Sequence, residues 1–441
     1  VTVDFYLINE KNVRGNHQLK ISVTDYQGKV MEVGTYETEA AGGEVYGQLL
    51  VKDVKIPVPT AGGLCRIEAK LCKENSVVTT GYDDILSVNL ASNMLDGKGA
   101  VWEDGSALQN FLKGKTKEAV AAYEDNLGKL DWIMVARPPR KDQLTMVPME
   151  ALRSADGKPG LDVVYYEDME FQKEVYHEVA KVVNLSAIEG ATPSPFVYML
   201  DGYGIKWSGK VLPSVSGEYT IIPQSNDRSM IEVFVNGKKI YEITRKKEHL
   251  GDGKVYLEGG KSADIEIRFR HPRSNARCRL DWAVPNDKMP DAQRLMERAV
   301  NDGTKIFIIQ SADEWSEFIA ANSKVVFKDK FFVGTNWLGG VMFNKPHDIF
   351  KELPVGNALN WPYQALIHTG VERMGLVMEG EELLVGAYHT YPMAIGTAMG
   401  IVPMGKGSVL FSTLDIYGNI INDSAAGLVA KKLIFNMIDF K

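Results

Sequence analysis

Cysteine is scarce in this 441-residue sequence, which contains three. Cys65 and Cys72 fall in one alternating run, L-C-R-I-E-A-K-L-C, which is typical of a strand. Seven strand steps separate them by about 23 Å, whereas a disulfide needs Cα atoms within about 7 Å. These two residues therefore cannot pair within that strand, and Cys278 stands alone. We expect buried, inert thiols, and the spacing fits no zinc site.

Long apolar runs and an excess of basic residues are also missing. No run of eighteen apolar residues occurs, so we expect no segment that spans a membrane. The formal net charge is −7, which disfavours a nucleic-acid partner. The sequence begins at Val1 without Met or a secretory signal. We therefore expect a piece of a longer protein whose targeting signal is not in this sequence.

The usual catalytic motifs are absent as well. The sequence has no G-x-S-x-G elbow, Walker loop or dinucleotide-binding loop. Glycoside hydrolysis needs two carboxylates at a fixed separation, and no pair is distinguished here. An eight-fold barrel would take about 250 residues, more than the strand–helix repeats of this chain can supply. We expect this chain alone to be catalytically inactive.

Alternating strands are clearest between residues 207 and 282. The run I-E-V-F-V (231–235) alternates as a strand with one buried face does. Asn236-Gly237 follows and supplies the two left-handed positions of a tight hairpin turn. I-E-I-R-F-R (265–270) predicts a second half-buried strand. Short strands separated by turn signals predict an antiparallel β-sandwich.

Six motifs keep their order in this stretch: W-S-G, P-x-x-S-G-x-Y, S-N-D, V-N-G-K, L-x-G-G and L-D-W. Upstream, P-G-L-D-V-V-Y-Y (159–166) fits a first strand, and G-A-T-P-S-P (190–195) fits a proline-bearing loop. Together they resemble the protective-antigen-type β-sandwich, the PA14 domain, over residues 159–284. The resemblance implies that Trp207 and Trp282 belong to the core.

Residues 1–90 also alternate. Strands are predicted at V-D-F-Y-L-I-N (3–9), L-K-I-S-V-T-D (19–25), V-K-D-V-K-I-P-V (51–58) and L-C-R-I-E-A-K-L (64–71). This pattern predicts a small immunoglobulin-like β-sandwich. The motifs F-Y-L-I-N-E-K-N-V-R-G-N-H-Q-L, Y-G-Q-L-L-V-K-D-V-K-I-P and G-Y-D-D-I resemble a sandwich that follows the catalytic barrel in bacterial family-two glycoside hydrolases of the β-galactosidase type.

The spacing of apolar residues changes after Gly97, where predicted strands begin to alternate with predicted helices. A helix with an N-cap at Ser106 is predicted after the strand 99–103. A second helical stripe is formed by Val120, Tyr123 and Leu127, before the strand 131–136. Residues 137–158 are polar and predict a connection.

The same alternation returns after residue 284. A helix over 289–302 with a Gly303 cap, the strand 305–310, and a helix opened by a Ser311–Glu314 capping box are predicted. A buried strand over 407–416 and a helix over 424–437 follow. We therefore predict one discontinuous α/β domain, residues 91–150 and 285–441, interrupted by the inserted sandwich.

This divided domain resembles the glutamine-amidotransferase-like domain attached to some of the same hydrolases. The similarity rests on L-L-V-G-A-Y-H-T-Y-P (383–392), P-M-G-K-G-S-V-L-F-S-T-L-D-I (403–416) and the order of strands. An active amidotransferase needs a nucleophilic cysteine, and neither half of this domain contains one. The resemblance therefore implies a catalytically silent domain.

Candidate carbohydrate-binding residues follow from the PA14 resemblance. In some PA14 lectins two adjacent aspartates hold a calcium ion that binds sugar hydroxyls, and Asn226-Asp227 is the matching position. Because Asn replaces a charged ligand, we predict no metal and no other cofactor, with calcium as the open alternative. Asn226, Asp227 and Arg228 could bind a sugar directly; the alternative is an Asx turn.

Aromatic residues of the α/β domain give a second set of candidates. Trp337, Trp361, His389 and Tyr391 fall in segments that read as loops at strand ends. Their rings could stack on a sugar, and packing is the alternative.

The resemblances imply a non-catalytic accessory region of a secreted or periplasmic β-galactosidase-like hydrolase that acts on polysaccharide or oligosaccharide. The catalytic barrel would precede Val1 and would be a partner of this chain. Carbohydrate is the other expected partner. The divided domain would serve packing, homo-oligomerisation or glycan binding. A free-standing lectin or adhesin and a purely structural fragment are the alternatives.

Overall fold

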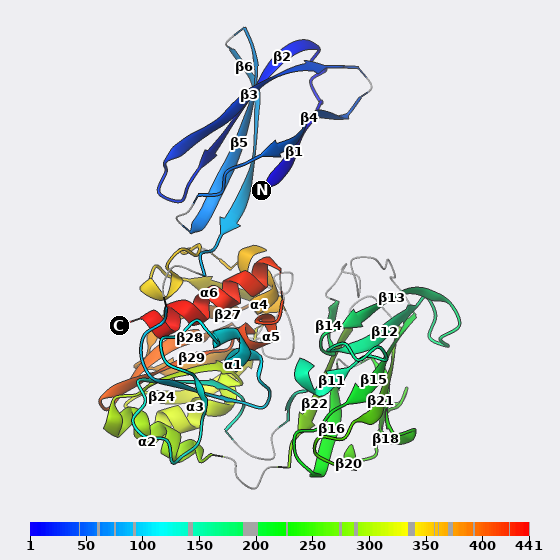
Figure 1. The fold of residues 1–441 in the computed structure, drawn as a ribbon, viewed down its shortest axis with the longest axis vertical. Helices are drawn as coiled ribbons and strands as arrows, with labels where there is room; N and C mark the ends of the chain where they lie inside the picture. Colours follow the sequence, from blue (N-terminus) through cyan, green and yellow to red (C-terminus); the bar gives the residue numbers. More distant parts are fainter. Residues whose placement is uncertain are drawn as a thin grey trace.

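The structure is a computed structural model. It describes residues 1–440 except 44, 60–61, 75, 91–93, 140–143, 188–201, 226–227, 273–275, 286–289, 334–339, 357, 360, 369–373, 391–392 and 423. Figure 1 shows the N-terminal strands at one end of the molecule, a helix-covered sheet below them, and a β-sandwich beside that sheet.

The N-terminal part is a β-sandwich. Its strands are β1 (Thr2–Ile8), β2 (Gly15–Thr24), β3 (Val30–Ala40), β4 (Gly47–Lys55), β5 (Gly63–Lys73) and β6 (Ser76–Ser87). β1 pairs with β4, and the second sheet has the order β3-β2-β5-β6. Alternate side chains of β2, such as Ile21 and Val23, are buried against Cys65 and Ile67 of β5. The four strands predicted here are confirmed.

The second part is a ten-stranded sheet of order β24-β26-β28-β29-β23-β9-β7-β8, with β27 joining β25 to β28. Its strands are β7 (Gly99–Glu103), β8 (Ala121–Ala122), β9 (Trp132–Ala136), β23 (Lys305–Gln310), β24 (Val326–Phe332), β25 (Gly340–Asn344), β26 (Met374–Glu379), β27 (Glu382–His389), β28 (Ala394–Met404) and β29 (Gly407–Ser412). The helical segments are α1 (Ala107–Leu112), α2 (Ala292–Asp302), α3 (Ala312–Ala321), η3 (Asp348–Phe350), η4 (Trp361–Tyr363), α4 (Gln364–His368), α5 (Ile416–Asn419) and α6 (Ala425–Asp439).

Strands far apart in the sequence meet at the centre of this sheet. β23 pairs in parallel with β9, Lys305 facing Trp132, and in parallel with β29 on its other side. Ile306 and Ile308 pack against α2 and α3, whereas Phe307 and Ile309 pack on the opposite face against α1 and α6. A strand that is apolar on both faces needs such a double cover.

Two helix ends form as predicted. Gly303 has φ 79° and ends α2, whose Leu295, Met296 and Ala299 are buried. Ser424 begins α6 and accepts a hydrogen bond from the Gly427 N–H. The helix predicted through Val120, Tyr123 and Leu127 is wrong. The short strand β8 lies there instead, because the Tyr123 N–H bonds the Val101 carbonyl of β7.

Ser106 and Ser311 occupy the predicted N-cap positions of α1 and α3, but neither hydroxyl accepts a capping hydrogen bond. Ser106 precedes α1 without a capping hydrogen bond from its hydroxyl. The carboxylate of Glu103 accepts the N–H groups of Leu108 and Gln109 in its place. Ser311 has φ 53°, so its hydroxyl makes no cap bond and the box with Glu314 does not form.

The third part is an antiparallel sandwich of two sheets, β10-β22-β16-β20 with β14, and β13-β12-β15-β21-β17-β18-β19 with β11. Its strands are β10 (Thr145–Met146), β11 (Leu152–Arg153), β12 (Leu161–Tyr166), β13 (Glu174–Ala180), β14 (Asn184–Ala187), β15 (Tyr203–Val211), β16 (Gly217–Ser225), β17 (Met230–Val235), β18 (Lys238–Ile243), β19 (His249–Leu250), β20 (Lys254–Leu257), β21 (Ala263–His271) and β22 (Ala276–Ala283). The short helix η1 (Met149–Ala151) lies between β10 and β11.

The core of the sandwich matches the predicted alternation. Trp207 and Trp282 are buried among its inward-facing side chains, which confirms them as core residues. Asn236 (φ 49°) and Gly237 (φ 75°) form the predicted hairpin turn between β17 and β18. Cys278 is buried here, and Cys65 and Cys72 are buried in the N-terminal sandwich, all three as free thiols.

Residues 137–158 are more than a connection, which corrects the sequence-based interpretation. β10 pairs with β22, placing Thr145 opposite Trp282, and β11 pairs with β15. The chain therefore enters and leaves the sandwich on neighbouring strands. Arg137 and Asp104 form a buried ion pair at this junction, and the Thr145 hydroxyl donates to Asp104 at 2.6 Å.

Candidate ligand-binding pocket

A pocket of about 660 Å³ opens at one end of the sandwich. Four chain segments form its walls: the β12–β13 turn, the start of β17, the β18–β19 turn and the end of β21. The lining residues are Met169, Glu170, Arg228, Ser229, Met230, Thr244, Arg245, Lys247, Arg270 and Pro272. Its volume lies in the range of roughly 300–1,000 Å³ that is typical of ligand sites.

The β12–β13 turn is held by one carboxylate. Asp168 accepts the backbone N–H groups of Glu170 (2.8 Å), Gln172 (3.1 Å) and Lys173 (2.6 Å). Desolvation would raise the pKa of Asp168, but these N–H donors outweigh it and lower the pKa. The turn therefore presents Met169 and Glu170 to the pocket from a defined backbone.

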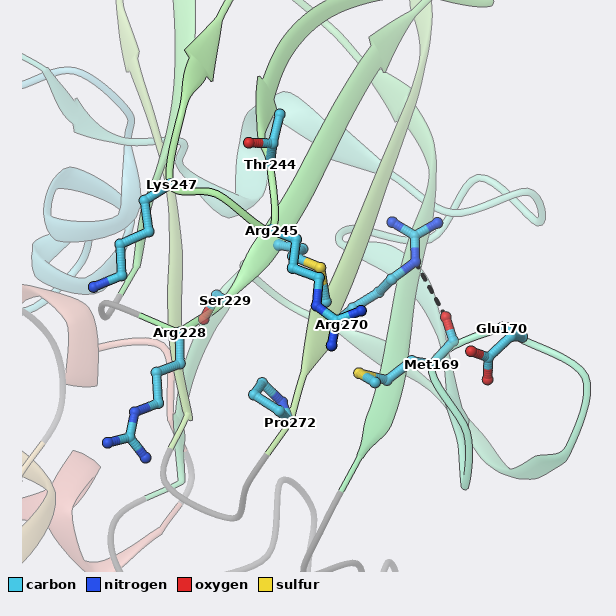
Figure 2. A pocket seen from close by; sticks show the side chains of 10 residues that line it. Met169, Glu170, Arg228, Ser229, Thr244, Arg245, Lys247, Arg270 and Pro272 are labelled. Atoms are coloured by element: carbon cyan, nitrogen blue, oxygen red, sulfur yellow. Dashed lines mark hydrogen bonds between the residues drawn. The ribbon is translucent and has the colours of Figure 1, made fainter.

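The β18–β19 turn is built in the same way. The Thr244 hydroxyl accepts the N–H groups of Lys246 (3.3 Å) and Glu248 (3.2 Å). Lys247 has φ 63°, which closes the turn with its N–H on the Thr244 carbonyl. The turn carries Arg245 and Lys247 to the rim, where both side chains are exposed. In Figure 2 Arg245 lies between Lys247 and Arg270.

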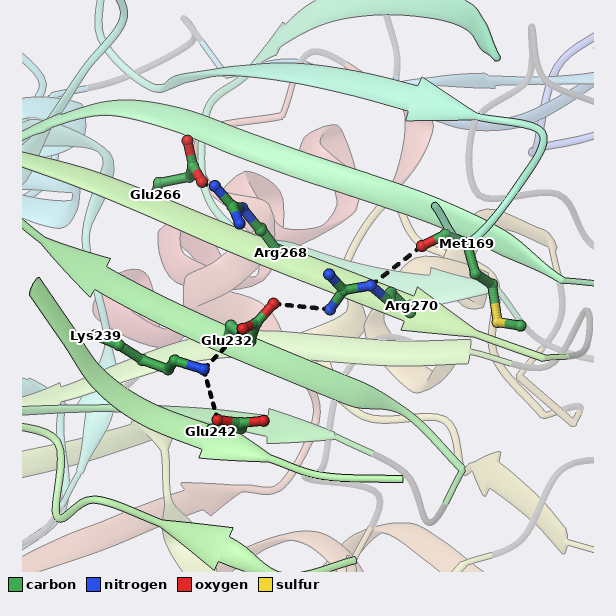
Figure 3. A network of polar contacts seen from close by, with 7 residues as sticks. All are labelled: Met169, Glu232, Lys239, Glu242, Glu266, Arg268 and Arg270. Atoms are coloured by element: carbon green, nitrogen blue, oxygen red, sulfur yellow. Dashed lines mark hydrogen bonds and ion pairs between the residues drawn. The ribbon is translucent and has the colours of Figure 1, made fainter. Parts of the chain in front are cut away.

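Arg270 is fixed by contacts on several sides. Its Nε donates to the Met169 carbonyl at 3.1 Å, and its guanidinium donates to Glu232 at 2.8 Å. The guanidinium also lies 4.7 Å from the ring centre of Phe171. Glu232 in turn accepts from Lys239 at 2.9 Å, as Figure 3 shows.

This network lowers the pKa of Glu232: desolvation opposes ionisation, but Lys239 and Arg270 outweigh it. The carboxylate stays charged and holds Arg270 in place at the pocket wall.

The pocket is strongly cationic. Among the described residues, Arg228, Arg245, Lys247 and Arg270 line it, against the carboxylate of Glu170. A smaller cavity of about 210 Å³ adjoins it, because Ser229 and Lys247 line both. The described residues of this end suit an anion better than a calcium ion, which prefers several carboxylate oxygens. No group of three metal-ligating side chains occurs among the residues that the structure describes.

The structure places three of the seven predicted site residues. Arg228 lines the pocket. Trp361 lies on η4 with 45% of its surface exposed. His389 ends β27, and its Nδ1 lies 2.9 Å from the Phe332 carbonyl. Neither Trp361 nor His389 lines the pocket. The other four, Asn226, Asp227, Trp337 and Tyr391, fall outside the described residues.

The remaining pocket cations were missed in the sequence. Arg245-Lys246-Lys247 is a basic run between two strands, which marks an exposed turn. Arg270 continues the polar face of the predicted strand 265–270. Neither signal indicates that the two segments meet, because their proximity depends on the order β21-β17-β18 in the sheet.

A second polar cluster lies at the carboxyl ends of the parallel strands. Glu103 is the last residue of β7 and accepts the Tyr417 hydroxyl at 2.8 Å in addition to the N–H groups of α1. Asp104 and Arg137 pair beside it. Open α/β sheets bind ligands at this edge, but here these side chains contact one another.

The sequence profile of the PA14 domain matches residues 157–294. This sandwich is a PA14 domain. The match covers the pocket and confirms the resemblance seen in the order of the motifs.

Individual proteins resemble parts of the chain. The anti-sigma-I factor RsgI3 of Acetivibrio thermocellus is 28% identical over 127 residues, which are 28% of this chain and 19% of that protein. The chain thus matches about a fifth of the length of this curated relative.

Two solved structures are also similar. A β-glucosidase from Kluyveromyces marxianus has 13% identity over 50% of this chain and 29% of its own, with a TM-score of 0.33. The epithelial adhesin 9 A domain of Candida glabrata, solved with Galb1-4GlcNAc, has 12% identity over 34% of this chain and 90% of its own, with a TM-score of 0.24. Among the described helices, none is long and apolar enough to cross a membrane.

Proposed function

We propose that the PA14 domain binds carbohydrate in the pocket between the β12–β13 and β18–β19 turns. The observation that carries this proposal is a concave site whose walls are set by backbone hydrogen bonds and whose lining mixes charged donors with Met169 and Pro272. A sugar offers hydroxyls to such donors and C–H faces to such apolar side chains. Sites with fixed walls lose little entropy on binding.

Binding to a glycan array by the full 441-residue chain tests this function. Replacing Arg270 with Ala removes the fixed guanidinium from the wall, and we expect glycan binding to weaken by about tenfold or more, as hydrogen bonds to charged groups contribute about 1.5–3 kcal/mol. Arg294→Ala is the matched control, because Arg294 is an exposed arginine on α2, away from the pocket. Absence of binding to every glycan tested would refute the proposal.

We further propose that the chain is a non-catalytic accessory region of a secreted or periplasmic β-galactosidase-like hydrolase. The three cysteines lie outside the segments that resemble an amidotransferase, and the polar groups at the sheet edge are engaged with one another. Both observations favour a supporting role for the α/β part. A free-standing lectin or adhesin is the alternative. The coding sequence upstream of Val1 separates them, since a hydrolase requires a barrel with paired carboxylates there.

A further inference from the structure

Arg270 is paired with Glu232, but the other three cations that line the pocket have no ion-pair partner among the described residues. Within the described part of the chain, Arg228, Arg245 and Lys247 form no ion pair, and all three are exposed. Elsewhere on the same sandwich, several basic side chains are matched with carboxylates, as in Lys239–Glu232, Lys254–Glu218, Lys261–Glu258, Arg268–Glu266 and Arg279–Asp281. Among the described residues, positive charge therefore exceeds negative charge in the pocket, although the chain carries a net charge of −7.

These cations come from separate segments of the chain that line one pocket. Arg228 precedes β17, Arg245 and Lys247 lie on the β18–β19 turn, and Arg270 is near the end of β21. Figure 2 shows Arg228 and Lys247 on one side of Arg245, and Arg270 on the other. Like charges brought together in a concavity repel one another, so their positive potential is greatest where a ligand would sit. An anion relieves this repulsion.

Arg270 adds a donor that is already oriented. Its bonds to the Met169 carbonyl and Glu232 use part of the guanidinium fork. A guanidinium matches the two oxygens of a carboxylate or sulfate better than it matches a lone hydroxyl. Met169 and Pro272 supply apolar surface beside it, which suits the C–H face of a sugar ring.

We infer that this pocket selects acidic glycans, holding a uronate carboxylate or a sulfate ester between Arg245, Lys247 and Arg270. This inference rests on the proposed function, because it specifies which carbohydrates the PA14 domain takes. Glu170 faces the same pocket and opposes an anion. Its charge would limit affinity, so its removal should strengthen the binding of acidic sugars and leave neutral sugars unaffected.

Calorimetric titration of the full chain with three oligosaccharides tests the inference. The probes are oligogalacturonate, a sulfated galactan oligosaccharide and a neutral galactan oligosaccharide of equal length. We expect the better acidic probe to bind at least about tenfold more tightly than the neutral one, and to weaken as salt rises from about 50 to 300 mM. Comparison of the two acidic probes identifies carboxylate or sulfate as the preferred anion.

Variants locate the effect. In the double variant Arg245→Gln, Lys247→Met we expect the preference for the acidic probe to disappear, whereas Glu170→Gln should strengthen acidic binding by about two- to fivefold. Lys254→Met and Arg294→Gln remove exposed cations away from the pocket and should leave the preference intact. Unchanged melting temperatures confirm that each variant folds.

The possible failures are distinguishable. Equal binding of neutral and acidic probes, or acidic binding that the double variant retains, would overturn the inference and leave the proposed function standing. Acidic binding that falls equally in the control variants would show a non-specific charge effect and would also overturn it. Binding of none of the three probes, together with an empty glycan array, would overturn the proposed function itself.

Discussion

At the scale of single residues, Glu103 shows how burial and hydrogen bonds compete at one carboxyl group. Desolvation raises the pKa of Glu103 above its usual 4.5, although the N–H groups of Gln109 and Leu108 and the Tyr417 hydroxyl all favour the charged form. The folded chain therefore holds this proton more tightly than the unfolded chain. Stability from this group is present below about pH 4.5 and is lost as the pH rises through the raised pKa.

Glu103→Gln removes this titration. Gln loses part of the helix cap at every pH, so the variant should be less stable at pH 4.5. We expect its deficit in unfolding free energy to shrink as the pH rises to about 7.5, because the wild-type protein alone must then bury a charge. Urea unfolding at several pH values measures the difference, and Glu258→Gln, at an exposed site, provides the control. If the unfolding free energies of the wild type and Glu103→Gln differ by the same amount at every pH, the raised pKa of Glu103 is contradicted.

At the scale of elements, local patterns predicted the strands better than the capping hydrogen bonds of the helices. Alternation identified β2, β17 and β21 because one face of each strand is buried and the other is not. The stripe at residues 120–127 misled because apolar residues three or four apart also fit a short strand followed by a turn. Ser311 is a common N-cap residue, but its φ of 53° is set by the turn from β23 into α3 and turns its hydroxyl away from the cap.

The candidate site was predictable only in part, for a related reason. Arg228 was identified because it follows a motif of the PA14 domain. Arg245 and Arg270 lie 25 residues apart in the sequence and meet through the pairing of β17 with both β18 and β21. Side chains brought together by sheet order leave no periodic signal in the chain.

The β17–β18 hairpin offers a test at this scale. Gly237 has φ 75°, and a Cβ atom added there would meet nothing within 4 Å. Gly237→Ala should therefore cost only the conformational penalty of a left-handed L-residue, about 1–2 kcal/mol. Thermal unfolding of the PA14 domain measures this cost. The turn lies at the end of β17 away from Met230, so glycan affinity should stay unchanged. Gly260 also has a positive φ, 76°, and a Cβ atom added there would meet nothing within 4 Å. Gly260→Ala should therefore cost a similar amount of stability.

At the scale of the whole molecule, the junction between the sheet and the PA14 domain is held by a buried ion pair. Arg137 follows β9, Asp104 follows β7, and their side chains are 7% and 12% exposed. Thr145 of β10 donates to Asp104, and the indole N–H of Trp315 in α3 donates to the Arg137 carbonyl at 2.8 Å. Three elements of the sheet region and the first strand of the sandwich thus meet at one charged pair.

Removing the charge of Asp104 should lower the unfolding free energy strongly, because Arg137 stays buried without its partner. Desolvation lowers the pKa of Arg137, and Asp104 acts against that effect. Asp104→Asn leaves the guanidinium without a countercharge, and we expect a loss of about 3–5 kcal/mol. The pair Arg66–Asp84 is the matched control, because its arginine side chain is 49% exposed. Asp84→Asn should cost less than about 1 kcal/mol.

Urea unfolding followed by tryptophan fluorescence measures the loss in Asp104→Asn, since Trp102, Trp132 and Trp315 lie in the sheet region. The N-terminal sandwich contains no tryptophan, so circular dichroism follows the unfolding of Asp84→Asn. The two variants separate the roles of the pair. If Asp104→Asn costs no more than Asp84→Asn, the junction is not held by this contact, and the strand pairing of β10 with β22 must position the PA14 domain instead. Suppose instead that Asp104→Asn loses much unfolding free energy while glycan binding persists below the unfolding transition. The pair then stabilises the junction between the sheet and the PA14 domain and takes no part in glycan recognition.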